Sequence, residues 1–144
     1  MPSDPRRWIY GGLDLAFAVA YVVAIAKVIP NRLPSAQLHL WTLPLAMAAL
    51  GTGTLLGTRR GWSIALAGGS LLLLSTFLII VRILISAAFL AGVYGAFGKA
   101  AATFSLLSIA IVVEVVVLLP IVQVKYLMSR AGRRAYGAPA RGFR

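Results

Sequence analysis

Two long apolar runs joined by a glycine-rich segment constrain this chain more than any other feature of its sequence. They extend from Gly61 to Tyr126, and the segment GVYGAFG at 92–98 lies between them. An apolar run of about 20 residues is long enough to cross the ~30 Å core of a bilayer as an α-helix. The stretch therefore predicts an antiparallel hairpin of two membrane-spanning helices that turns near Gly98 and Lys99.

The composition of the whole chain favours the same environment. Of the 144 residues, 60% are hydrophobic and only 12% are charged, which is far from the usual mix of a soluble domain. A soluble domain this apolar would expose surface that it has too few polar groups to cover. The length suits a single membrane domain, 1–144. The sequence contains no cysteine, which excludes disulfides and thiolate metal sites.

Two further apolar runs precede the hairpin. Pro30, Asn31 and Pro34 separate them, and we expect no regular structure through these residues. Pro120 is expected to kink the last helix, because proline lacks a backbone donor. The sequence thus predicts an all-α fold, an integral membrane four-helix bundle with up-down-up-down topology. The predicted spans are 8–29, 41–58, 62–90 and 101–127, and a mobile basic tail, 128–144, follows them.

An alternative interpretation of the first run is a cleaved signal peptide that covers residues 1–26. Its positive region would be Arg6 and Arg7, and the segment AIA at 24–26 would be its cleavage site. Asp14 lies inside the apolar region, and the run is long enough to span a bilayer. Both observations favour a retained span.

The basic residues are distributed unevenly between the two ends of the predicted spans. Ten of the 14 fall on the side of the chain termini, three fall on the other side, and Arg82 lies within a span. Because cytoplasmic segments carry an excess of lysine and arginine, this bias predicts that both termini lie in the cytoplasm. The ten are Arg6, Arg7, Arg59, Arg60, Lys125, Arg130, Arg133, Arg134, Arg141 and Arg144, and the three are Lys27, Arg32 and Lys99.

Three ionisable residues lie within the predicted spans: Asp14, Arg82 and Glu114. A charge at mid-membrane costs ~2.5–3.5 kcal/mol on insertion scales, so each is expected to pair, become neutral or reach water. Arg82 and Glu114 lie at equal separations in sequence on the two sides of Gly98. This symmetry predicts that the two meet at one depth as an ion pair. Asp14 is expected to reach interfacial water or the two arginines at 59–60.

The predicted pair has two interpretations. Ser75 and Ser86 share a helix face with Arg82, whereas the positions one and two turns from Glu114 are all apolar. Because so few polar side chains surround the two charges, we favour a structural ion pair that holds the last two helices in register. The alternative is a path for protons or a solute, because charges inside a membrane are functional candidates by default.

Small residues recur at every fourth position through the second span. Ala49, Gly53, Gly57 and Gly61 follow the small-xxx-small pattern, which lets helix backbones approach closely. We predict that they form a helix-packing face. Its partner is either another helix of this chain or another copy.

No catalytic or metal-binding constellation is visible in the sequence. His39 is the only histidine and has no second ligand candidate nearby. Ser105 and Ser108 lie in an apolar helix without a base, and we expect them to bond back to helix carbonyls. We therefore predict a protein that is not an enzyme and has no cofactor and no metal.

The net charge of +11 raises the question of a nucleic-acid partner. The charges cluster at the ends of apolar segments, and no polar region of domain size presents a basic face, so no nucleic-acid partner is expected. The arginines of the tail 128–144 are instead expected to contact anionic lipid head groups, at about 1 kcal/mol each.

Four short motifs give the chain a resemblance to known proteins. They are Gly61-Trp62, GVYGAFG at 92–98, VVEVVVLLP at 112–120 and YLMSRAGRRAYG at 126–137. Through them the C-terminal half resembles a loose group of small uncharacterised four-helix bacterial membrane proteins. The resemblance implies a helical bundle in the bacterial cytoplasmic membrane and implies no activity.

These observations lead to two functional hypotheses. The first is a non-enzymatic interaction or assembly component of the membrane, embedded in the lipid bilayer and forming a homo- or hetero-oligomer. The second is a small protein that conducts protons or a solute by means of Glu114 and Arg82.

Overall fold

The computed structural model describes residues 5–28, 34–112 and 117–139, and their regular structure is entirely helical. This confirms the all-α prediction for the part of the chain described. The helices are α1 Arg6–Val28, α2 Pro34–Leu56, α3 Arg59–Val93, α4 Gly95–Val112, α5 Leu118–Met128 and α6 Arg130–Ala135.

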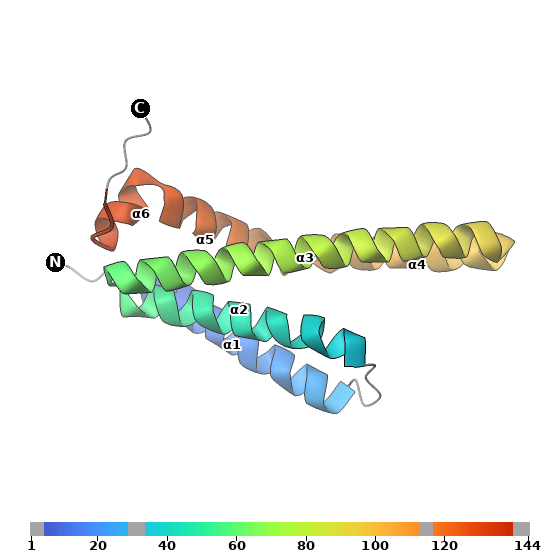
Figure 1. Ribbon diagram of the computed structural model, residues 1–144, viewed down its shortest axis with the longest axis horizontal. Helices are drawn as coiled ribbons and strands as arrows, with labels where there is room; N and C mark the ends of the chain where they lie inside the picture. The colour runs from blue at the N-terminus through green and yellow to red at the C-terminus, as the bar shows by residue number, and fades with distance from the viewer. Residues whose placement is uncertain (1–4, 29–33, 113–116, 140–144) are drawn as a thin grey trace.

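Successive passes along the long axis alternate in direction. α1 runs away from one end of the molecule, α2 returns, α3 runs out again, and α4 and α5 return (Figure 1). The start of α1, the α2–α3 junction and α6 lie together at the end that we call the basic end. Its described arginines are Arg6, Arg7, Arg59, Arg60, Arg130, Arg133 and Arg134.

Local capping signals set the helix boundaries at the basic end. α2 ends before Gly57, whose φ of 60° suits glycine. Thr58 then caps α3, because its side chain accepts a hydrogen bond from the Gly61 amide at 3.1 Å. Ser129 caps α6 in the same way through the Gly132 amide at 3.0 Å. Short polar residues between apolar runs thus produce two sharp turns.

The first helix of the α3–α4 hairpin is longer than predicted, and the turn lies earlier. α3 runs for 35 residues, and the chain reverses at Tyr94 and Gly95, where Gly95 has φ 55°. The prediction of a turn near Gly98 and Lys99 was wrong, because both residues lie inside α4. Of the three glycines in the segment 92–98, Gly95 alone has the left-handed conformation that the turn uses.

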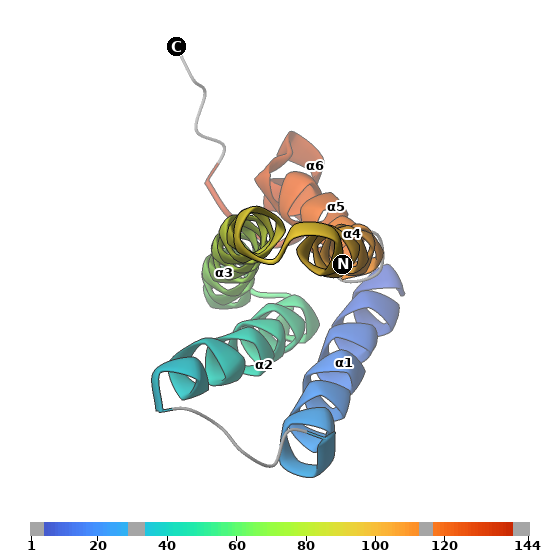
Figure 2. The same ribbon diagram turned by 90° about the vertical axis from the view of Figure 1, so that its right-hand side faces the viewer.

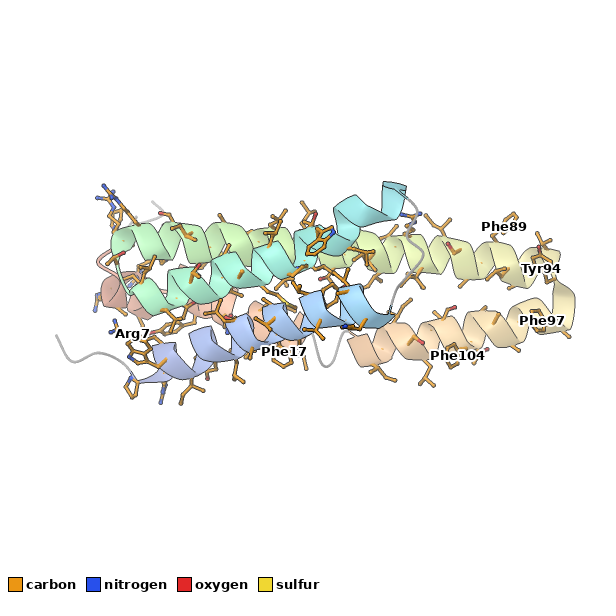
Figure 3. All side chains as sticks on the ribbon, turned by 90° about the horizontal axis from the view of Figure 1, so that it is seen from below. Arg7, Phe17, Phe89, Tyr94, Phe97 and Phe104 are labelled. Atoms are coloured by element: carbon orange, nitrogen blue, oxygen red, sulfur yellow. The ribbon has the colours of Figure 1, made fainter. Side chains whose placement is uncertain are left out.

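The hairpin projects well beyond the other helices. α1 and α2 end roughly midway along the molecule, whereas α3 and α4 continue past them (Figures 1 and 3). Viewed along the long axis, α1 and α2 lie on one side of the hairpin and α6 lies on the other (Figure 2). The end of the hairpin therefore has no other described helix beside it.

One of the two predictions about proline was wrong. α2 begins at Pro34 rather than near residue 41, because a proline at the first helical position loses no hydrogen bond. Pro120 lies buried in the first turn of α5. The described parts of the predicted span 101–127 belong to α4 and α5. The predicted kink stays a prediction, because residues 113–116, the turn before Pro120, lie outside the described residues.

The predicted mobile tail is structured over its first part. α6 follows α5 directly, and Tyr136 is buried with its hydroxyl donating to the carbonyl of Thr54 at 3.3 Å. A side chain from the tail thereby anchors α6 to the C-terminal turn of α2. The prediction was wrong for this segment because glycines limit long helices but permit a short capped one.

The apolar core lies in the half of the molecule nearer the basic end. Its buried members come from α1, α2, α3 and α5, with Tyr136 added from beyond α6. They are Ala18, Leu43, Ala46, Met47, Leu50, Ala65, Leu72, Leu127 and Tyr136.

Within the described ranges, two helices are long and apolar enough to cross a membrane. Arg6–Lys27 covers 22 residues with a mean hydropathy of 1.9, and Arg59–Val93 covers 35 residues with a mean hydropathy of 2.5. The apolar helices Leu40–Leu56, Gly95–Ile111 and Leu118–Met128 are shorter. Length and composition are therefore compatible with a membrane location, although a soluble core helix or a signal sequence satisfies the same criterion.

Candidate functional site

The most unusual polar feature in the described residues is a buried carboxyl–amide pair. Asp14 on α1 is only 3% exposed and Gln123 on α5 is only 6% exposed. The Gln123 side-chain amide, Nε2, donates a hydrogen bond to Oδ1 of Asp14 at 3.2 Å. The bond joins residues that are 109 positions apart in sequence.

Helix α2 packs close behind Asp14. A Cβ atom added to Gly51 would lie 3.0 Å from Cβ of Asp14 and 2.9 Å from the carbonyl oxygen of Gly11. A side chain at position 51 would therefore separate α1 from α2. Glycine there permits the backbone contact that keeps water away from the carboxyl group.

The second oxygen of each group is left without a partner among the described residues. Oδ2 of Asp14 and Oε1 of Gln123 are both buried, and neither accepts a hydrogen bond. Buried polar atoms are rarely left unpaired, and an orphaned acceptor costs about 1–3 kcal/mol. Among the described residues, Nε of Arg7 and Nε of Arg133 are also buried without a partner, but only Asp14 and Gln123 leave unpaired atoms on two groups that are bonded to each other.

The prediction for Asp14 was wrong in its partner. The carboxyl group does not reach interfacial water, because it is buried, and its hydrogen-bond donor is Gln123 rather than the arginines at 59–60. Gln123 was not among the residues predicted from the sequence. The available signal was a single amide within the apolar run that leads to Lys125.

The observed position of the turn no longer places Arg82 and Glu114 at equal separations from it. An equal count on the two sides of the observed turn at Tyr94 places Arg82 opposite Leu106 rather than Glu114. The side chain of Arg82 is exposed on α3, and its carbonyl accepts a bond from the Ser86 hydroxyl at 2.9 Å. Glu114 lies outside the described residues, so the pair stays a prediction without its original basis.

The four small residues predicted as one packing face lie in three different settings. Gly53 on α2 packs against α3, where an added Cβ would lie 2.6 Å from the carbonyl oxygen of Gly61. Ala49, also on α2, contacts the α3 backbone at Gly68. Gly61 belongs to α3 and faces Gly53, while Gly57 ends α2 and lies against the guanidinium of Arg7. The prediction of one face was therefore wrong, and the partner of Ala49 and Gly53 is α3 of the same chain.

Aromatic and basic side chains are combined at the basic end. The indole nitrogen of Trp62 donates to the carbonyl of Leu127 at 2.8 Å, which fastens α3 to the end of α5. The guanidinium of Arg133 lies 5.9 Å from the Trp62 ring centroid, and that of Arg7 lies 5.4 Å from the Trp8 ring. Such cation–π contacts hold arginines beside indole rings at the boundary of an apolar region.

The serines of α4 donate hydrogen bonds to carbonyls of their own helix. Ser105 donates to the carbonyl of Ala101 and Ser108 donates to that of Phe104, both at 2.9 Å. This confirms the predicted back-bonding. Across residues 5–28, 34–112 and 117–139, no three acidic, histidine or cysteine side chains are grouped as metal ligands.

The end of the hairpin carries large apolar side chains that no described helix covers. We call this set the distal hairpin surface. Phe89 and Tyr94 project from α3 and the turn, and Phe97 and Phe104 project from α4 (Figure 3). The members are Leu84, Ile85, Phe89, Val93, Tyr94, Phe97 and Phe104, which are between 42% and 80% exposed.

No protein-family model, no curated protein and no solved structure matches this chain. Function is therefore inferred from the site geometry and from the surface of the molecule.

Proposed function

We propose that this protein is an integral membrane four-helix bundle that acts as a non-enzymatic assembly component and associates with a second copy through the distal hairpin surface. The observation that carries this proposal is the projection of the α3–α4 hairpin, with uncovered aromatic side chains, beyond the ends of α1 and α2 (Figures 1 and 3).

A bilayer fits the part of the bundle next to the basic end. At 1.5 Å per residue, the rise from Trp8 to Lys27 along α1 and the rise from Trp62 to Arg82 along α3 are both about 30 Å. This length equals the thickness of a typical hydrocarbon core. Tryptophans would then lie at one interface, while Lys27 and Arg82 would extend to the other.

The outward surface of this part supports contact with lipid. Large apolar side chains are exposed along α1 and along α3 as far as Leu78, where a soluble protein would present polar groups. They include Ile9, Leu13, Phe17, Val19 and Val23 on α1, and Leu71, Leu74, Phe77 and Leu78 on α3.

Charge asymmetry orients the bundle in this proposal. The basic end combines arginines from three parts of the chain, so the positive-inside rule places it in the cytoplasm. Retention of α1 is part of the proposal, because Ala18 belongs to the apolar core and Asp14 is bonded to α5. The arginines near α6 would then face anionic head groups.

Single-cysteine labelling tests this orientation in a chain that has no cysteine of its own. In intact cells, Lys99→Cys on α4 should react with a membrane-impermeant maleimide, whereas Arg134→Cys on α6 should react only after permeabilisation. Both side chains are exposed, so burial does not explain a difference. The reverse pattern, or equal labelling of both, contradicts the proposed topology.

The distal hairpin surface would lie outside this bilayer. At the rise of an α-helix, the turn at Tyr94 lies ~18 Å past Arg82 and so past the second interface. Summed over α3, the turn and α4, the seven exposed side chains present roughly 800 Å² of apolar surface, taking about 150–250 Å² for a fully exposed aromatic side chain and less for an aliphatic one. The largest apolar patch of a typical monomer is ~300–600 Å². An exposed apolar surface of this size is expected to be buried against a binding partner.

The partner that we propose for the distal hairpin surface is a second copy of the chain. A stable interface buries about 800 Å² per partner, which matches the surface available. Closed homo-oligomers with twofold symmetry are the commonest assemblies, and a self-complementary apolar surface suits them. Two hairpins side by side would form a second bundle outside the bilayer, with the aromatic rings packed between them.

Oxidative crosslinking tests this association. In membranes, Phe89→Cys and Phe104→Cys should form covalent dimers several-fold faster than Phe17→Cys. Phe17 is the matched control, because it is an exposed phenylalanine on α1 in the proposed lipid-facing part (Figure 3). Equal rates at all three positions would indicate random collision. A hairpin that stays monomeric would show that lipid or another protein covers it, which contradicts the proposal.

The alternative, conduction of protons or a solute by Glu114 and Arg82, receives no specific support from the described residues. Arg82 projects from the outer surface of α3, and Glu114 lies outside the part of the chain described. It therefore stays a hypothesis from sequence.

A further inference from the structure

One added proton would give both unpaired oxygens, Oδ2 of Asp14 and Oε1 of Gln123, a hydrogen-bond partner. The two groups already share the bond from Nε2 of Gln123 to Oδ1 of Asp14 at 3.2 Å, and each group retains one buried acceptor. One hydrogen shared between these two acceptors would satisfy both. A proton on Oδ2 supplies it, because a carboxylic acid is both a donor and an acceptor.

We propose that Asp14 and Gln123 form a neutral proton-holding site. Oδ2–H of Asp14 donates to Oε1 of Gln123 while Nε2–H of Gln123 donates to Oδ1, so the acid and the amide close a ring of two hydrogen bonds. The bound ligand is one proton. This site is independent of the proposed dimer, which uses the opposite end of the molecule.

The described surroundings offer no cation that would favour a carboxylate instead. The segment Leu40–Leu56 of α2, which covers Asp14 through Gly51, contains no ionisable residue. Arg7 lies two turns away on α1, beside Trp8 and Gly57, and Lys125 on α5 is exposed. An ionised Asp14 would be a charge that is only 3% exposed, with one hydrogen bond from an uncharged donor.

The site joins two helices whose main packing partners differ. α1 packs mainly on α2, and α5 packs mainly on α3. The Asp14–Gln123 ring therefore connects the first helix directly to the last pass of the chain. Loss of the proton would place two acceptors face to face and weaken that connection.

Infrared spectroscopy of the full-length protein at neutral pH tests the site. The carbonyl band of a protonated carboxylic acid should be present in the wild-type protein and absent from Asp14→Asn. Glu114→Gln is the matched control and should retain the Asp14 band. Gln123→Leu should shift the band to higher frequency, because the acid then loses its amide partner. If Asp14→Asn removes no acid band, or if Gln123→Leu leaves the band in place, the proposal is overturned.

An exchange of the two groups tests the geometry independently. The double variant Asp14→Asn with Gln123→Glu moves the acid to α5 and the amide to α1 without changing the length of either side chain. It should regain the protonated-acid band and melt within a few degrees of the wild-type protein. A double variant that lacks the band refutes the ring.

Discussion

Replacing Gly53 with leucine is expected to separate α2 from α3 and to destabilise the bundle strongly. An added Cβ would lie 2.6 Å from the carbonyl oxygen of Gly61 and 2.8 Å from Cα of Ala65. These are backbone atoms, so neither can rotate away as a side chain would. Overpacking of this kind typically costs about 1–3 kcal/mol and more where backbone must move, against a total stability of only ~5–15 kcal/mol.

The matched control is Gly12→Leu on α1. An added Cβ there meets nothing within 4 Å, so leucine contributes only its better helix propensity, about 1 kcal/mol or less. Thermal melting in detergent, followed by tryptophan fluorescence, should show a large fall for Gly53→Leu and no fall for Gly12→Leu. Equal melting temperatures would contradict the close α2–α3 contact.

Replacing Gly98 with leucine is expected to open the distal hairpin without unfolding the core. An added Cβ would clash with the carbonyl oxygen of Leu90 and would lie 3.2 Å from Cα of Ala91. The first turn of α4 would therefore have to move away from the last turns of α3. The apolar core lies nearer the basic end, so it should remain intact.

Hydrogen exchange measures this local opening. Amides near the α3–α4 turn should exchange about tenfold to a hundredfold faster in Gly98→Leu, since ~1.4 kcal/mol corresponds to a factor of ten. Gly92→Leu is the control, because position 92 lies in the same hairpin and has nothing within 4 Å. Faster exchange in both variants, or in α2 as well, would refute a contact specific to Gly98. The opened hairpin should also lose the proposed dimer crosslinks.

Much of the architecture was predictable because helix formation in this chain depends on local pattern. Long apolar runs with basic ends led to helices that pass back and forth, and the described part is helical in that order. The positions of the breaks were less predictable. Gly92, Gly95 and Gly98 are equivalent as sequence signals, and their roles differ only because Gly95 turns the chain while Gly98 packs against Leu90.

The candidate site was likewise predictable from the sequence only in part. The sequence singled out Asp14 as a costly group in an apolar run, which required some form of compensation. It did not identify Gln123, because the distance between residues 109 positions apart depends on how α1 and α5 pack and not on either helix alone. The count that paired Arg82 with Glu114 failed for a related reason. A shift in the turn by a few residues changes every depth along the opposing helix.

By itself, the sequence determined that this chain is helical and apolar, that its basic residues gather at one end, and that its small residues pack closely. These properties follow from composition and spacing, which act over one or two helical turns. The tertiary structure alone decided that Gly61 faces Gly53, that Tyr136 anchors α6 to α2, and that Asp14 meets Gln123. Those contacts join distant segments, so they depend on the turn position and on helix packing, which local periodicity does not encode.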